Sequence, residues 1–311
     1  MPKALALQQF PGELQVIDIN MPTPGPDELL VRVAATSVNG FDMATIAGYL
    51  QGMMEHRFPL VPGKDFAGTV VAVGEQVEGF SVGDEVFGVV SKDHLGTGSF
   101  AEYVTTPASI GVALRPEALP VAVAGALGLA GAAAHDSVGA LGDITGKTVL
   151  ISGATGGVGA LAVQLAANRG AQVIATAKGD AGTFFEGLIS ETITVVDYTG
   201  DLDAQVRAVA PAGVDAAVHL AGDLGQITAL VRDGGSVYSA IGQPESPDGR
   251  DLNVGMIMAN PARATLDELA ELVANGALSV PVSRTFTLEE AANAVAEFAA
   301  GARGKISIDV S

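Results

Sequence analysis

A glycine-rich turn is the feature of this sequence that points most directly to a chemistry. Residues 148–152 are largely apolar and β-branched, as in a buried parallel strand. The turn 153–159 follows, and apolar residues then recur at helical spacing. Glycine lets the backbone approach a pyrophosphate, and a helix N-terminus presents N–H groups and a positive dipole end to phosphates. This order predicts a dinucleotide-binding turn, with contacts from Ala154, Thr155, Gly156, Gly157 and Val158.

The next expected strand, residues 172–176, bears on which nicotinamide cofactor binds. An NAD site usually has Asp or Glu at the end of this strand, where it binds the ribose 2′-hydroxyl. Here the strand ends at Thr176, Lys178 follows, and the first carboxylate is Asp180. With Thr176 and Lys178 as cofactor contacts, a 2′-phosphate is favoured, and NADPH is the expected cofactor. The alternative is that Lys178 is only a solvated loop cation and Asp180 binds the ribose.

Two later strand ends are expected to complete the cofactor site. Open parallel sheets bind ligands beyond the carboxyl ends of their strands. Ala221 follows the expected strand 214–219. Ile241 ends the expected strand 235–241, and Gly242 follows it. We therefore expect these three residues to contact the cofactor.

Composition narrows the class of protein and its partners. The chain has 311 residues, a formal net charge of −19 and no cysteine. Such a charge disfavours nucleic acid and anionic membranes as partners, so a small-molecule substrate is expected. The lack of cysteine excludes disulfides, iron–sulfur clusters and thiolate zinc sites. No signal-peptide pattern is present, which predicts a cytoplasmic protein, and the apolar stretch 118–134 predicts a buried helix rather than a membrane span.

Strand and helix patterns predict an α/β protein with two domains. Residues 119–260 alternate strands with helices, which predicts a doubly wound parallel (Rossmann) sheet. Residues 1–118 and 261–311 are expected to form a discontinuous β-rich domain, because the last expected strand, 306–310, has no place in the nucleotide domain. The outermost parallel strand, 252–259, is apolar at an exposed edge, so we expect a homodimer joined through it.

Several motifs, in order along the chain, resemble those of a known family. They are Val38-Asn39-Gly40-Phe41-Asp42, residues 62–68, Gly83-Asp84-Glu85-Val86, residues 98–103, the glycine turn, residues 288–294 and Gly304-Lys305-Ile306. On these motifs nearly the whole chain resembles the zinc-free quinone oxidoreductase branch of the medium-chain dehydrogenase/reductase superfamily, which includes zeta-crystallin. The resemblance implies a GroES-like β-rich domain, and Tyr198 matches a family Tyr that flanks the adenosine phosphate.

The resemblance also bears on metal chemistry. Zinc-dependent members carry Gly-His-Glu where this chain has Gly63-Lys64-Asp65, and its four histidines lack ligand spacing, so no metal is expected. Hydride delivered to a plain ketone leaves an alkoxide, whereas a quinone or enone leaves a delocalised phenolate or enolate. The pKa of a phenol is about 10 and that of an alcohol is near water's, roughly 15.7. Each pKa unit corresponds to about 1.4 kcal/mol, so the oxyanion formed from a conjugated acceptor needs several kcal/mol less stabilisation than an alkoxide.

Three candidate catalytic residues follow from the resemblance. Asn39 matches an Asn near the nicotinamide, or it is a turn-stabilising side chain. Tyr49 lies one residue before the position of a family Tyr that orients or protonates the substrate, and water is the alternative donor. Lys64 matches a zinc-ligand position and either stabilises a developing enolate or pairs with Asp65 or Asp42.

We therefore expect an NADPH-dependent reductase acting on quinones or α,β-unsaturated carbonyl compounds. Two alternatives stay open. One is a zinc-free carbonyl reductase or alcohol dehydrogenase that uses a protein proton donor. The other is an NADPH-binding protein with negligible turnover. Two cations of the tail, Arg303 and Lys305, are expected on the surface away from the cleft, or else at the cofactor phosphates.

Overall fold

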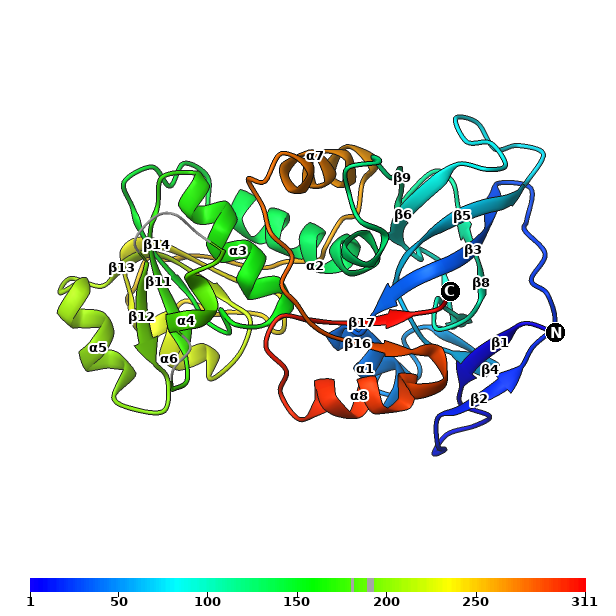
Figure 1. Cartoon of the computed structure of the whole chain (residues 1–311). Helices are drawn as coiled ribbons and strands as arrows, with labels where there is room; N and C mark the ends of the chain where they lie inside the picture. The colour runs from blue at the N-terminus through cyan, green and yellow to red at the C-terminus, as the bar shows by residue number, and fades with distance from the viewer. Residues whose placement is uncertain (180–181, 189–192) are drawn as a thin grey trace. The chain divides into compact units, whose positions relative to one another are not determined.

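The computed structural model describes residues 1–179, 182–188 and 193–311 (Figure 1). Asp180, the alternative ribose ligand, lies outside the described residues. The chain forms two compact units. Unit 1 contains Met1–Ala132, Pro261–Asn275 and Val282–Ser311, and unit 2 contains Ala133–Asn260 and Gly276–Pro281.

Unit 2 is built on a six-stranded sheet in which every pairing is parallel. In sheet order its strands are β12 (Thr194–Asp197), β11 (Gln172–Ala177), β10 (Thr148–Ile151), β13 (Val214–His219), β14 (Val231–Ser239) and β15 (Asn253–Met256). Its helices are α3 (Gly157–Asn168), α4 (Gly182–Phe185), α5 (Leu202–Val209) and α6 (Leu224–Ala229). The predicted α/β class with a Rossmann-type parallel sheet is confirmed.

Helix α3 is enclosed almost completely because its residues are small or apolar. Nine consecutive residues, Gly159 to Ala167, are buried. The one amide among them, Gln164, donates to the carbonyl oxygens of Ala160 and Ser279, each at 2.8 Å. It also accepts from the Ser279 N–H at 2.7 Å, so burial leaves none of its donors without an acceptor.

Unit 1 contains a seven-stranded sheet and two strand pairs. The sheet order is β16 (Val282–Thr287), β17 (Lys305–Asp309), β3 (Glu28–Ser37), β5 (Asp65–Val73), β6 (Glu85–Val89) and β9 (Val112–Leu114), with β8 (Tyr103–Pro107) paired to β3. The pairs are β1 (Lys3–Ala6) with β2 (Gln15–Asp18) and β4 (Glu55–Val61) with β7 (His94–Thr97). Strand β17 runs antiparallel to β3, so the last strand returns to the N-terminal sheet as predicted.

The remaining helices are α1 (Gly40–Ile46), α2 (Val121–Gly139), α7 (Arg263–Ala274), the 3₁₀ turn η1 (Leu288–Glu290) and α8 (Ala291–Ala299). Among the described residues, α2 alone has the length and apolar composition to cross a membrane, but 67% of its apolar window is buried, as in a core helix. The chain passes from unit 1 to unit 2 within α2, between Ala132 and Ala133.

Two strands of unit 1, β4 and β16, have little strand signal in their sequence. Strands β4 and β16 are mostly exposed, so they lack the apolar alternation that signals a strand. Strand β4 also contains Pro59, which argues against a strand interior. Pairing with β7 and β17, rather than local sequence preference, places β4 and β16 in strands.

Candidate cofactor and active site

The glycine turn joins β10 to α3 at the carboxyl edge of the parallel sheet. Helix α3 begins at Gly157, with Gly156 as its N-cap. A Cβ on Gly159 would lie 2.2 Å from the Gly153 carbonyl oxygen, so only glycine lets the first helical turn pack this closely. Ala154 is fully buried within the turn. The small residues of the turn thus let α3 pack closely against the end of β10, where a ligand would bind.

The outer side of the turn has few neighbouring atoms at Gly156. A Cβ on Gly156 would meet only the Gly153 carbonyl oxygen within 4 Å, at 3.3 Å. Thr155, Gly157 and Val158 are only partly buried, at the start of the helix where the positive dipole end lies. These residues therefore fit the phosphates of a dinucleotide.

The neighbouring strand ends lie along the same edge of the sheet. Strands β10 and β13 are adjacent, and the strand order reverses between them, which is where open sheets bind ligands. Ala221 follows β13, and Ile241 and Gly242 follow β14; all three lie within a few residues of the strand ends. Thr176 is 3% exposed, and its hydroxyl accepts a hydrogen bond from the Gly153 N–H at 3.0 Å.

Two exposed side chains follow the adjacent strands β11 and β12. Ala177 pairs with Asp197 in the ladder, so Lys178 and Tyr198 stand directly after paired residues. Both side chains are exposed. The carboxylate of Asp197, the residue before Tyr198, accepts from the N–H and hydroxyl of Thr199, and these bonds lower its pKa. A cation and an aromatic ring at adjoining strand ends are suited to a phosphorylated ribose and its base.

Three buried polar residues that the sequence analysis did not single out hold the loops of this edge. They are Ser152, His219 and Ser239, exposed by 2%, 3% and 0%. The Ser152 hydroxyl accepts from the Leu220 N–H at 3.1 Å. The His219 ring nitrogens lie 2.9 Å from the Ser239 hydroxyl and 3.1 Å from the Gly222 carbonyl oxygen. In the sequence, each of these residues is a hydroxyl or imidazole side chain at the end of an apolar strand, and this pattern could have pointed to them.

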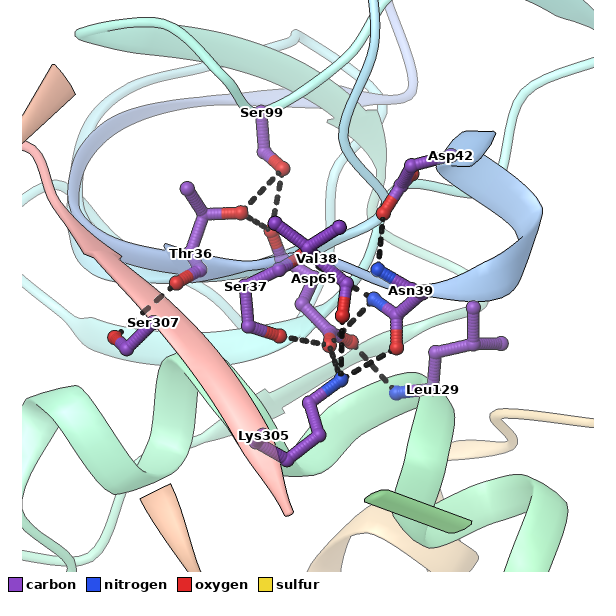
Figure 2. A network of polar contacts seen from close by, with 10 residues as sticks. All are labelled: Thr36, Ser37, Val38, Asn39, Asp42, Asp65, Ser99, Leu129, Lys305 and Ser307. Carbon is purple, nitrogen blue, oxygen red and sulfur yellow. Dashed lines mark hydrogen bonds and ion pairs between the residues drawn. The ribbon is translucent and has the colours of Figure 1, made fainter. Parts of the chain in front are cut away.

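Unit 1 holds a second polar cluster, centred on the fully buried Asp65 (Figure 2). Its carboxylate accepts from Ser37 Oγ at 2.6 Å, Asn39 Nδ2 at 2.9 Å and the Leu129 N–H at 2.7 Å, and it pairs with Lys305 Nζ at 3.2 Å. A buried carboxylate is stable only when donors and a counter-charge replace water. This cluster supplies both.

Lys305 and Asn39 occupy fixed positions in this cluster. Lys305 is 2% exposed, so its expected surface or phosphate-binding role is wrong. Its ammonium donates to Asn39 Oδ1 at 2.5 Å and to the Val38 carbonyl oxygen at 3.3 Å. Asp65 therefore pairs with Lys305 and not with Lys64. Both ends of the Asn39 amide are engaged, so its orientation is set, and its contact with a nicotinamide stays a prediction.

Lys64 and Asp42 line one small pocket of unit 1. The Lys64 ammonium donates to the Val90 carbonyl oxygen and lies 5.0 Å from the centre of the Phe41 ring. Asp42 Oδ2 accepts from the Asn39 N–H at 2.8 Å and thereby caps α1. A cation and a carboxyl group thus share a pocket with an aromatic wall.

Burial shifts the pKa of both groups. It lowers the pKa of the Lys64 ammonium, against the opposing charges of Asp42 and Asp65. Burial, and then the charge of Asp65, raise the pKa of Asp42 to about 7. Near neutral pH this pocket therefore holds a carboxyl group that can take up or release a proton. Tyr49, the expected proton donor, has a 78% exposed side chain, and its role stays a prediction.

Comparison with known proteins identifies the family. The family described as "Alcohol dehydrogenase GroES-like domain" matches residues 25–116, and the family described as "Zinc-binding dehydrogenase" matches residues 192–307. A chloroplast envelope quinone oxidoreductase homolog from Arabidopsis thaliana is 35% identical over 214 residues, 67% of this chain and 64% of that protein. This chain belongs to the medium-chain dehydrogenase/reductase superfamily.

Further relatives agree with this assignment. A 2-methylene-furan-3-one reductase from Solanum lycopersicum is 31% identical over 239 residues, 75% of this chain and 60% of that protein. The structure of a quinone oxidoreductase from Coxiella burnetii matches with a TM-score of 0.86 and 27% identity, covering 100% of this chain and 99% of that one. The matched segments thus span less than two thirds of both curated relatives. Membership implies a nicotinamide cofactor and a GroES-like β-rich domain.

The residues of this chain do not fit the zinc site of its zinc-dependent relatives. Within the described ranges, no group of three or more His, Cys, Asp or Glu side chains could hold a metal ion. The sequence has no cysteine to supply a thiolate. The Lys64 ammonium hydrogen-bonds to the Val90 carbonyl oxygen.

Proposed function

We propose that this protein is an NADPH-dependent, zinc-independent reductase that transfers hydride to quinones or α,β-unsaturated carbonyl compounds. The observation that carries the proposal is the Lys64 ammonium in a pocket of unit 1, in a chain with a glycine turn that fits a dinucleotide. By resemblance, Lys64 stands at the position of a zinc ligand. A conjugated acceptor yields a delocalised oxyanion, which a single cation can stabilise without a metal. Two relatives, a quinone oxidoreductase homolog and a furanone reductase, support this acceptor class.

Reduced nicotinamide supplies the hydride when it is bound. The chain's own residues supply binding, orientation and charge. The glycine turn and the start of α3 bind the pyrophosphate, and Lys178 favours the 2′-phosphate of NADPH. The cluster around Asp65 holds the Asn39 amide in one orientation. Lys64 stabilises the developing enolate or phenolate, and Tyr49 or water returns the proton.

Steady-state oxidation of NADPH and NADH with quinones, enones and plain ketones tests the proposal. We expect turnover with conjugated acceptors and a preference for NADPH. Turnover of plain ketones alone would favour the carbonyl reductase alternative, and tight NADPH binding without any turnover would favour a non-catalytic binding protein. A preference for NADH would refute the cofactor assignment.

Two lysine substitutions separate the roles. Lys64→Met should lower kcat/KM for an enone by about 100-fold, the scale of one lost oxyanion-stabilising group. Lys178→Ala should raise KM for NADPH about tenfold and leave KM for NADH unchanged. Lys147→Met, at an exposed site outside the predicted cofactor contacts, is the matched control. Equal kinetics for Lys64→Met and the control would remove Lys64 from the active site.

A further inference from the structure

His219 links two of the loops that end at the edge of the parallel sheet. It is the last residue of β13 and is 3% exposed. Its Nε2 lies 3.1 Å from the Gly222 carbonyl oxygen, in the loop after β13. Its Nδ1 lies 2.9 Å from the Ser239 hydroxyl, at the end of β14. One imidazole therefore joins neighbouring loops that carry the predicted cofactor contacts Ala221 and Ile241.

The partners assign the protonation of this ring. A carbonyl oxygen only accepts, so Nε2 carries the proton and donates to Gly222. The Ser239 oxygen already accepts from the Ile241 N–H at 3.2 Å and the Gly242 N–H at 3.1 Å. Its two lone pairs are then used, so its hydroxyl proton must go to Nδ1. The neutral Nε2–H tautomer satisfies every donor in this group, whereas a proton on Nδ1 would leave the hydroxyl without an acceptor.

The same kind of contact recurs along the edge. The Thr176 hydroxyl of β11 holds the Gly153 N–H after β10. The Ser152 hydroxyl, after β10, holds the Leu220 N–H after β13. His219 and Ser239 continue this series to the loop after β14. Adjacent strands therefore hold each other's loops through buried polar side chains, and only the His219–Ser239 pair joins the loops after β13 and β14 in this way among the described residues.

We propose that His219 and Ser239 are positioning residues for nucleotide binding, which hold the loops at 220–222 and 240–242 in the shape that accepts the nicotinamide nucleotide. The inference rests on the proposed function, because it assigns these loops to the cofactor site. It adds two residues that act through the backbone of the loops. Neither side chain needs to touch the cofactor, since both are buried and their polar atoms are already bonded.

Two measurements on the full chain test the pair. The first is the Kd for NADPH, by fluorescence titration. The second is amide hydrogen exchange, by mass spectrometry, of peptides covering 219–223 and 239–243. Ser239→Ala should raise both the Kd and the exchange rate at 240–242 about tenfold, because the Ile241 and Gly242 N–H groups lose their acceptor. Ser137→Ala is the control, since Ser137 is equally buried in unit 2 and its hydroxyl has no hydrogen-bond partner among the described residues.

Substitutions of His219 give a graded series. In His219→Asn the new side chain can still accept from the Ser239 hydroxyl, and in His219→Gln it can still donate to the Gly222 carbonyl oxygen. Each of these variants should therefore raise the Kd for NADPH less than His219→Leu, whose side chain can do neither. Wild-type Kd and exchange in both Ser239→Ala and His219→Leu would overturn the inference. If His219→Leu does not fold, Ser239→Ala decides alone. If the wild type binds no nucleotide, the proposed function fails, and unchanged exchange in Ser239→Ala would then reject the loop-holding role separately.

Discussion

Replacing Lys305 with methionine tests whether the buried cluster of unit 1 depends on a charge pair. Methionine keeps most of the side-chain length but removes the ammonium. The change deletes the hydrogen bonds to Asp65, Asn39 and Val38. It leaves the Asp65 carboxylate fully buried with three neutral donors and without the ammonium that pairs with it.

The structure sets the size of the effect. Breaking a buried ion pair by removing one partner costs about 3–5 kcal/mol, since it leaves an uncompensated charge. For a unit of this size 1 kcal/mol shifts the melting temperature by about 2–4 °C, so Lys305→Met should lower it by about 6–20 °C. An exposed pair is worth far less. Lys3 and Glu289 lie 3.0 Å apart with side chains 48% and 61% exposed, so Lys3→Met should lower the melting temperature far less than Lys305→Met.

Differential scanning calorimetry and urea unfolding measure these changes in a double-mutant cycle. Asp65→Asn in the Lys305→Met background removes the unpaired buried charge. The double variant should therefore lose at least about 1 kcal/mol less unfolding free energy than the sum of the losses in the two single variants. Two results would refute the reasoning. One is a Lys305→Met variant no less stable than Lys3→Met, and the other is simple additivity in the cycle.

Two further predictions concern Asp42 and the exposed sheet edge. Burial raises the pKa of Asp42 to about 7 from its ordinary 3.8, so this group stabilises the fold below about pH 4 and that contribution is lost as pH rises through 7. In urea unfolding from pH 4 to 8, the free energy of unfolding should fall with pH more steeply in the wild type than in Asp42→Asn, by up to about 1.4 kcal/mol per pH unit. The variant keeps the acceptor for the Asn39 N–H, and parallel pH profiles for the two proteins would contradict the prediction. We also propose a dimer through the edge strand β15, where Met256 is 45% exposed. Light scattering after size exclusion should then show Met256→Lys as a monomer, with Met21→Lys, 50% exposed in unit 1, still a dimer; a monomeric wild type would exclude this interface.

Much of the nucleotide-binding unit could be predicted from the sequence, because its signals are local. Each buried parallel strand is a short apolar run, and the glycine turn lies within a few residues of the strand and helix that it joins. The strand ends then lie at one edge of the sheet, so Ala221 and Ile241 could be assigned to that edge without a structure. The exposed strands β4 and β16 could not be predicted, since little of their side-chain pattern faces a core.

The sequence by itself determined the superfamily, the parallel sheet and the turn that fits a dinucleotide, because these depend on residue order and spacing within short segments. Only the tertiary structure decided which charges meet. Lys305 and Asp65 are 240 residues apart, and they pair because β17 inserts beside β3, which also pairs with β5. His219 and Ser239 likewise end separate strands whose adjacency comes from the sheet order. Side-chain type shows that a group can donate, accept or carry charge, but its partner is set by contacts between distant segments.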